Sequence, residues 1–223
     1  GVAGSLARLG HSVLCIDMDI GLRNLDISLG LSDRALMDFS DVAEGRCPLV
    51  RAAVNHPDLP GLALLTAPMT LSSALTEEAV RRMLDTARSL YDYILIDSPA
   101  GLGTGFRMAC CGADRAIVVS TNDASSLRDA QRTVGELDFL RQIHLVMNRI
   151  QPKLLRQLRT TIDDAMDTAG LPLLGVVPED PQVMLSANLG RPLILGGRQG
   201  AANACLNIAK RLEGRRVPIM RIR

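Results

Sequence analysis

Short, continuous apolar runs alternate along the chain with longer segments in which apolar positions recur at helical spacing. Continuous apolar runs are typical of strands that are buried on both faces of a parallel sheet. We therefore expect an α/β fold with a doubly wound, mostly parallel sheet and helices on both of its faces. The expected strands are Ser12–Asp17, Leu62–Thr66, Tyr93–Asp97, Arg115–Ser120, Ile143–Met147, Leu173–Val177 and Pro192–Leu195. The expected helices cover residues 33–44, 76–90, 123–140, 153–169 and 199–212.

Two of these helices carry clear end signals. Thr76 is a good N-cap, and Glu77 and Glu78 then fall in the first turn, where the helix dipole favours anions. Gly170 and Pro172 follow the helix over 153–169 and predict its end. No linker or repeat divides the sequence, so we expect one domain over residues 1–223, with a short basic tail over 214–223.

The sequence opens with a helical pattern instead of a strand. Val2, Leu6 and Leu9 recur at helical spacing, and Gly10 has the character of a C-terminal cap. A helix that leads into the first strand favours the interpretation that a strand and a loop normally precede it. The alternative is an N-terminal helix that has lost its Met.

Composition narrows the classes of function. Hydrophobic residues make up 47% of the chain, which is enough for a substantial core. The net charge of +1 and the 2% of aromatic residues argue against sequence-specific nucleic-acid binding. Five cysteines without a C-x-x-C pair argue against a zinc site or a disulfide framework and favour the cytoplasm. Lys153 and Lys210 are the only lysines, so very few positions can supply a catalytic lysine.

Acidic residues follow two of the expected strands. Asp17 ends the first strand and Asp19 follows it two residues later, whereas Asp97 ends a later strand before the small-residue loop Ser-Pro-Ala-Gly101. Ligands of doubly wound sheets bind beyond the carboxyl ends of the strands. Carboxylates there can order a Mg²⁺ shell or an attacking water. An apolar strand that ends in Asp is the Walker B pattern, whose carboxylate holds Mg²⁺.

Two further strand ends carry polar turns. Asn148 and Arg149 follow one strand, and the amide of Asn148 can both donate to and accept from an adenine edge. Pro178, Glu179 and Asp180 follow the next strand and can wall the same base. Each motif alone is also compatible with an ordinary helix cap or turn. Because they all occur in the right order on an α/β pattern, they jointly predict a nucleotide site.

These residues also carry a resemblance to a known family. The string Asp17-Met-Asp19-Ile-Gly-Leu-Arg-Asn-Leu-Asp26 resembles the switch I segment of MinD-type P-loop ATPases. Asp97-Ser-Pro-Ala-Gly101 is similar to their Walker B and switch II segments, and Asn148-Arg149 and Gly175-Val-Val-Pro-Glu-Asp180 match in order and spacing. The resemblance covers residues 1 to about 212. ParA partition proteins carry a different string after the paired acids.

The resemblance implies roles for individual residues. Asp19 would position the attacking water with Asp17 in support, and Asp97 would hold the water shell of Mg²⁺. Gly101 would lie in the loop that senses the γ-phosphate, while Asn148, Arg149 and the turn Pro178–Asp180 would bracket the adenine of ATP. MinD-type proteins form a homodimer when ATP binds, with residues 21–24 near the interface, and act with protein partners of the division machinery. The implied location is the cytoplasm, or the inner face of the cell membrane.

One element of the family is missing from the printed residues. No G-K-G-G-x-G-K-T phosphate loop is present, and neither lysine lies beside a glycine-rich turn. We expect an ATPase in which this loop precedes Gly1, and we expect the 223 residues alone to be inactive. Two alternatives remain: a ParA-type or flagellar-type positioning ATPase, and a non-enzymatic module that binds a protein partner without the loop.

The C-terminal tail gives little support for membrane insertion. Gly214 is expected to cap the last helix, and Pro218 interrupts any new one. After Gly214, the only apolar residues besides Pro218 are Val217, Ile219, Met220 and Ile222. These are too few to form a helical face that could insert into a membrane. From Arg211 onward, five Arg and one Glu predict weak, salt-sensitive attraction to anionic lipid at most.

Overall fold

The computed structural model describes residues 1–220, and its contacts group the chain into two compact units. Unit 1 comprises Gly1–Gly112 and Met184–Gly196, and unit 2 comprises Ala113–Val183 and the residues from Gly197 onward. The mostly parallel strands and flanking helices that the sequence predicts are confirmed. The single domain expected over residues 1–223 stays a prediction.

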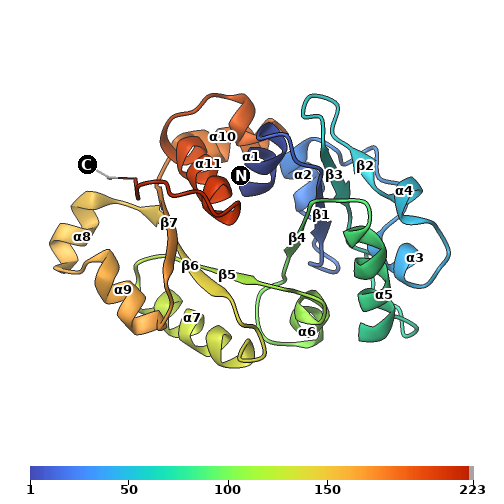
Figure 1. Ribbon diagram of the computed structural model, residues 1–223, viewed down its shortest axis with the longest axis horizontal. Coiled ribbons are helices and arrows are strands. Elements are labelled where there is room, and N and C mark those ends of the chain that lie inside the picture. The colour runs from blue at the N-terminus through green and yellow to red at the C-terminus, as the bar shows by residue number, and fades with distance from the viewer. Residues whose placement is uncertain (221–223) are drawn as a thin grey trace. The chain divides into compact units, whose positions relative to one another are not determined.

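Unit 1 contains a four-stranded sheet in the order β2-β3-β1-β4 (Figure 1). Its strands are β1 Val13–Asp17, β2 Val54–Asn55, β3 Leu62–Leu65 and β4 Tyr93–Asp97. Strand β1 pairs in parallel with both β3 and β4, whereas the short β2, which the sequence did not predict, pairs antiparallel with β3. The register places Asp17 opposite Asp97. The two acidic strand ends therefore lie side by side at one edge of the sheet.

The two faces of this sheet bury alternate residues of β1. Leu14 and Ile16 belong to the main apolar cluster, which also contains Phe39, Val80 and Leu84 from helices on that side. On the opposite face lies α1, which contacts β1 and β3. The helices of unit 1 are α1 Val2–Arg8, α2 Leu25–Leu29, α3 Phe39–Ala43, α4 Leu49–Ala52, α5 Glu77–Arg88 and α6 Thr104–Cys110.

Several local predictions for unit 1 are confirmed. Helix α1 opens the chain, and Gly10 follows it with a φ of +101°, a conformation that glycine adopts easily. The Thr76 side chain accepts a hydrogen bond from the Ala79 amide at the start of α5.

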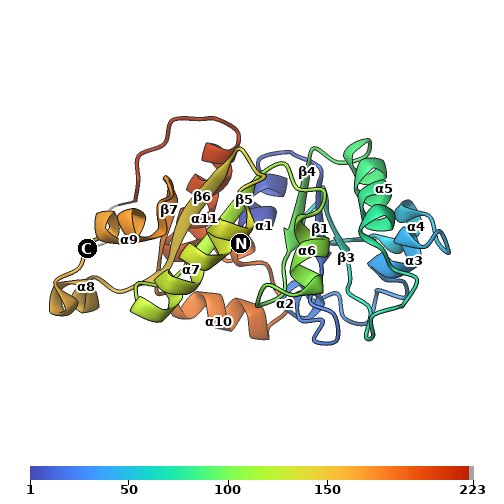
Figure 2. The ribbon, with the colours of Figure 1, turned by 90° about the horizontal axis from the view of Figure 1, so that it is seen from below.

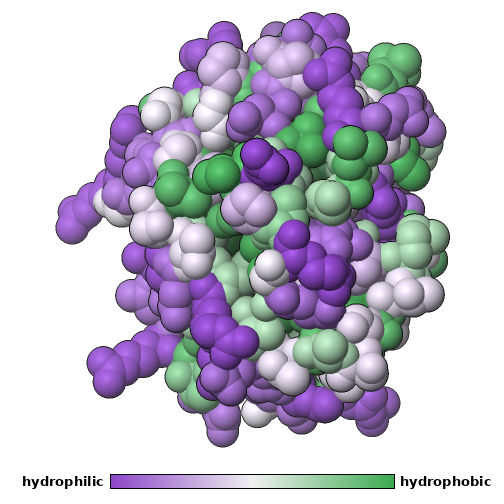
Figure 3. Space-filling view, turned by 90° about the vertical axis from the view of Figure 1, so that its right-hand side faces the viewer, coloured by the Kyte–Doolittle hydropathy of each residue, from purple (hydrophilic) through white to green (hydrophobic). Residues whose placement is uncertain are grey.

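Apolar side chains such as Val50 and Met69 remain exposed on this unit, and Figure 3 shows apolar surface among polar groups on the face that carries α3 to α5.

Unit 2 contains a parallel sheet in the order β5-β6-β7 (Figure 2). Its strands are β5 Ala116–Ser120, β6 Ile143–Ile150 and β7 Leu173–Pro178. Helices α7 and α9 contact each other and cover β5 and β6, whereas α11 packs on β7. The helices of this unit are α7 Ala124–Glu136, α8 Pro152–Leu158, α9 Ile162–Ala169 and α11 Gly200–Leu212. Helix α10, Pro181–Asn188, begins in unit 2 and ends in unit 1.

Three predicted elements differ from the structure. The helix expected over 33–44 covers only Phe39–Ala43, because the Asp38 side chain caps it there and Asp38 bridges to Thr66 beside β3. The helix expected over 153–169 is two helices, separated by Arg159 in the left-handed region and by a capping box at Thr161. The strand expected at Pro192–Leu195 is instead the 3-10 helix η1, Leu193–Leu195.

The C-terminal helix ends as expected. Gly214, with a φ of +81°, follows α11, and no helix lies between it and residue 220. Of the tail residues named above, Ile222 lies outside the described residues. Within residues 1–220, no helix combines the length and apolar character needed to cross a membrane.

Candidate functional site

Asp17 lies at the carboxyl end of β1 and is 1% exposed. Both of its carboxylate oxygens accept hydrogen bonds from the backbone of the following loop. Oδ1 accepts from the Asp19 amide at 2.9 Å, and Oδ2 accepts from the Leu25 amide at 3.1 Å. Both oxygens of Asp17 therefore fix the backbone of the loop that follows it.

Asp19 is half-buried at the start of that loop. Its carbonyl oxygen accepts hydrogen bonds from the amides of Leu22 and Arg23, so its backbone is fixed through both the N–H and the C=O. Within the part of the chain that the structure describes, the Asp19 carboxylate has no hydrogen-bond partner of its own. The loop thus presents a positioned carboxylate that can still accept hydrogen bonds.

Asp97 ends β4 directly beside Asp17. Its carboxyl is solvent-exposed by surface area, yet partial desolvation at the strand ends raises its pKa above the usual value for Asp, and the negative charges of Asp17 and Asp19 raise it further. The pKa shift places all three carboxylates within electrostatic reach of one another. A cation bound near this edge of the sheet would relieve that repulsion.

No complete metal cage is built here. Within residues 1–220, no group of three or more His, Cys, Asp or Glu side chains is arranged to hold a metal ion directly. Asp17, Asp19 and Asp97 together form what we call the acidic edge of the sheet. This edge fits a cation such as Mg²⁺ that keeps several waters and takes its other ligands from a bound phosphate. Asp97, with its exposed carboxyl, is the side chain that best suits that arrangement.

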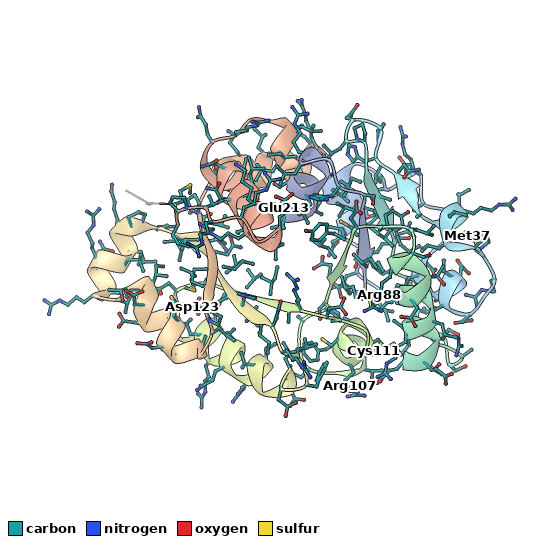
Figure 4. All side chains as sticks on the ribbon, viewed as in Figure 1. Met37, Arg88, Arg107, Cys111, Asp123 and Glu213 are labelled. Carbon is teal, nitrogen blue, oxygen red and sulfur yellow. The ribbon has the colours of Figure 1, made fainter. Side chains whose placement is uncertain are left out.

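A glycine loop follows Asp97 and leads into α6. Gly101 has a φ of +85° and open space where a Cβ would lie, so a ligand can approach its backbone closely. At its other end, α6 is tied to α5: Arg81 donates to the carbonyl of Cys111, and Arg88 donates to that of Gly112 (Figure 4). The helix after the loop is therefore anchored at its C-terminus, while its N-terminus has no side-chain cap.

In unit 2, Asn148 and Arg149 lie near the end of β6. The Asn148 Oδ1 accepts a hydrogen bond from the Arg149 amide at 3.0 Å, which leaves the Asn148 NH₂ group to donate elsewhere. Arg149 has a φ of +54°, and its Nε donates to Glu179 Oε2 at 2.8 Å. The Glu179 amide in turn donates to the carbonyl of Ile150. The turns after β6 and β7 are thus held together.

Asp180 joins the starts of two helices. Its Oδ1 accepts from the Gln182 amide at the start of α10, and its Oδ2 accepts from the Ala201 amide in α11, each at 2.9 Å. Both carboxylate oxygens therefore satisfy backbone N–H groups that a helix start would otherwise leave without a partner. At the start of α7, Asp123, labelled in Figure 4, has a similar capping role, because its carboxylate accepts from the Ser126 amide.

The structure groups the predicted residues within each unit. Asp17, Asp19, Asp97 and the Gly101 loop lie at the carboxyl ends of β1 and β4, and Asn148, Arg149 and Pro178–Asp180 lie at those of β6 and β7. Sequence reasoning missed Arg23, which lies in the loop after Asp19 and has a left-handed backbone with a φ of +47°. The string Gly-Leu-Arg-Asn gives no signal for this, because non-glycine residues seldom adopt the conformation.

Known proteins resemble this chain in sequence and in fold. A family model described as an AAA domain matches residues 1–155. The septum site-determining protein MinD of Synechocystis is 37% identical over 224 residues, which span 98% of this chain and 84% of the relative. A chain in the MinC:MinD cell division complex of Aquifex aeolicus matches with a TM-score of 0.91 and 36% identity, over 99% of this chain and 90% of that one.

A further solved structure contains a nucleotide. The MinD of Pyrococcus horikoshii complexed with Mg-ADP matches with a TM-score of 0.82 and 25% identity, over 95% of this chain and 87% of that one. The sequence matches extend over nearly the whole chain and most of each relative, and the fold agrees with them. The chain therefore belongs to the MinD family of septum site-determining P-loop ATPases.

Proposed function

We propose that this chain supplies the switch and hydrolysis residues of a Mg²⁺-dependent ATPase that works as a dimerisation switch in positioning cell division. The observation that carries the proposal is the acidic edge of unit 1. There, a backbone-fixed Asp19 with an available carboxylate lies near Asp97, whose pKa is raised by its surroundings and by neighbouring carboxylates. The Mg-ADP in the P. horikoshii relative supports the choice of nucleotide and metal.

Each acid has a distinct proposed task. The Asp19 carboxylate accepts a hydrogen bond from the attacking water and orients it toward the γ-phosphorus. The Asp97 carboxylate would hold a bound Mg²⁺ through water, and the ion would neutralise part of the phosphate charge. The Gly101 loop contacts the γ-phosphate through its backbone.

The residues of unit 2 are proposed to hold adenine. The Asn148 NH₂ group can donate to a ring nitrogen, because its Oδ1 already accepts from Arg149. Pro178 offers an apolar wall, and the Arg149–Glu179 ion pair fixes the shape of the turn. Asp180 is proposed to keep this turn in place through its two helix caps.

Hydrolysis also requires groups that the printed residues do not contain. A phosphate loop provides backbone N–H donors, a lysine and a Mg²⁺-binding hydroxyl. The proposal therefore applies to a protein in which such a loop precedes α1. Without it, we propose that the 223 residues bind nucleotide weakly and do not turn it over.

A homodimer and a protein partner complete the proposal. The Gly21 amide donates to the carbonyl of Pro68, so the segment that carries the exposed Leu22 (67%) lies beside the one that carries the exposed Met69 (64%), close in sequence to Asp19. Apolar side chains exposed there suit a surface that is covered when two nucleotide-bound copies meet. The complex of the A. aeolicus relative with MinC supports a partner from the division machinery.

Two substitutions test the division of tasks. They are made in a version in which a strand and a G-K-G-G-x-G-K-T loop precede Gly1. Asp19→Asn should leave ATP affinity within a fewfold while lowering kcat by about 100-fold or more. Asp97→Asn should lower kcat and, in addition, weaken the Mg²⁺-dependent binding of ATP. Asp167→Asn, exposed on α9, is the matched control.

The measurements are equilibrium binding of a fluorescent ATP analogue, with and without Mg²⁺, and steady-state release of phosphate. Equal losses of binding in Asp19→Asn and Asp97→Asn would show that the two roles are assigned wrongly. Full turnover in Asp19→Asn would remove Asp19 from the reaction.

A further inference from the structure

Asp17 is a buried carboxylate without a cationic partner among the described residues. It is 1% exposed, and the ion pairs of the described chain do not include it. A buried carboxylate needs strong hydrogen bonds, because an unpaired charge away from water is costly. Asp17 has two such bonds, to the amides of Asp19 and Leu25. Because Asp17 is buried and both of its oxygens point to backbone amides of the loop, this side chain is poorly placed to reach a water and take its proton.

The two bonds bracket one segment of chain. The first fixes the amide of Asp19, and the second fixes the amide of Leu25, at the start of α2. Between them, the Asp19 carbonyl closes a turn by accepting from the amides of Leu22 and Arg23. Loss of either Asp17 bond would therefore free one end of the segment that carries the Asp19 side chain.

Arg23 fixes the same segment from the other side. Its φ of +47° is unfavourable for a residue with a Cβ. Its Nε donates to the buried carboxylate of Asp26 at 3.2 Å, and its Nη2 donates to the carbonyl of Ala35 at 3.1 Å. A strained backbone persists where its surroundings fix it in this way. The segment from Asp19 to Leu25 is thus pre-organised.

We propose that Asp17 is a positioning residue, which sets the Asp19 carboxylate by holding the backbone on both sides of it, and that Asp17 takes no direct part in the reaction. The proposal rests on the proposed role of Asp19, and it gives Asp17 a structural task instead of a direct part in ordering Mg²⁺ or water. Pre-organisation of this kind matters because a misplacement of a reacting group by about 1 Å can cost about 100-fold in rate.

Hydrogen exchange of single amides in the nucleotide-free protein tests the positioning role directly. In Asp17→Asn, the side-chain NH₂ group replaces one acceptor, so one amide loses its partner. We expect exchange at Asp19 or Leu25 to rise at least about tenfold relative to exchange at Cys15 in β1. In the control Asp19→Asn this ratio should stay unchanged once the exchange rates are corrected for the intrinsic rate of the new residue.

The ratio of exchange at Asp19 or Leu25 to exchange at Cys15 decides the test even where Asp17→Asn destabilises the whole protein. Global unfolding raises exchange at Cys15, Asp19 and Leu25 together, and an equal rise at all three would overturn the proposal. A selective rise at Asp19 or Leu25 supports it. This readout does not depend on hydrolysis.

Kinetics then connect the positioning role to the reaction. Asp17→Asn should lower kcat about tenfold with little change in KM, whereas Asp19→Asn should lower kcat much further. An Asp17→Asn protein that loses as much activity as Asp19→Asn, with normal exchange at both amides, would make Asp17 a direct participant. If the version in which a phosphate loop precedes Gly1 has no ATPase activity, the proposed function fails, while the exchange result still decides the role of Asp17.

Discussion

At the scale of single residues, three similar carboxylates have three different surroundings. Asp17 is buried and bonded to backbone, Asp19 is half-buried with its carboxylate available, and Asp97 is exposed with a raised pKa. The sequence predicted that these acids gather, because they end neighbouring parallel strands. The strand pattern could not show that Asp17 and Asp19 have different surroundings. Residues two apart point to the same face of a sheet, but only while the strand continues. Strand β1 ends at Asp17.

The raised pKa of Asp97 has a consequence for stability. A carboxyl whose pKa is higher in the folded protein than in the unfolded chain favours folding at low pH and opposes it once pH exceeds the folded pKa. Asp97→Asn removes that charge. We therefore expect the variant to be more stable than the parent at pH 7, with a difference that shrinks as pH falls to the ordinary range of Asp. Urea denaturation across pH measures this, and a variant that is less stable at pH 7 would contradict it.

The left-handed backbone of Arg23 gives a second prediction. Arg23→Gly and Arg23→Ala both lose the bonds to Asp26 and Ala35, but only alanine keeps the steric strain of a φ of +47°. We expect Arg23→Ala to be less stable than Arg23→Gly by about 1 kcal/mol. Denaturant midpoints of the two variants provide the measurement. A more stable alanine variant would show that the backbone relaxes.

At the scale of elements, helices with a strong cap were predicted well. Thr76 begins α5, and Gly170 ends α9, as the sequence indicated. The errors arose where other contacts decide the boundary. Asp38 bridges to Thr66, far away in sequence, and Arg159 turns left-handed, a choice that periodicity does not encode. Strand β2, two residues long, has too short a pattern to be recognised.

The double cap at Asp180 can be tested as a property of two elements. Asp180→Ala leaves amides at the starts of α10 and α11 without partners. At about 1 kcal/mol for each cap, we expect a loss of roughly 2 kcal/mol in the free energy of unfolding. Asp167→Ala, exposed on α9, is the matched control. A loss no greater than that of the control would show that Asp180 is not needed to hold the two helix starts.

At the scale of the whole molecule, the strand and helix order was predicted from apolar runs and spacing, and the comparisons confirm the fold class. The sequence did not predict that hydrogen bonds divide the strands into two sheets, because an apolar run does not show which neighbour it pairs with. Strand β4 has one neighbour, β1, among the described residues, and its residues are only partly buried.

The C-terminal tail bears on membrane binding by the whole protein. Arg211 donates to the carbonyls of Val217 and Pro218, which folds the tail back onto α11. We expect liposome binding through this tail to require anionic lipid and to fade as salt rises to physiological levels. Co-sedimentation of the protein with and without residues 214–223 measures it. Salt-resistant, ATP-dependent binding that is lost on deletion would instead indicate insertion of the tail.

The most direct measurement is phosphate release with Mg²⁺ and ATP, compared between the 223-residue chain and a version in which a strand and a G-K-G-G-x-G-K-T loop precede Gly1. The account predicts Mg²⁺-dependent turnover by the longer protein, loss of that turnover in its Asp19→Asn variant, and none from the 223 residues alone. Turnover by the short chain, or an inactive longer protein that binds ATP and Mg²⁺ normally, would contradict the assignment of hydrolysis to the Asp19 edge.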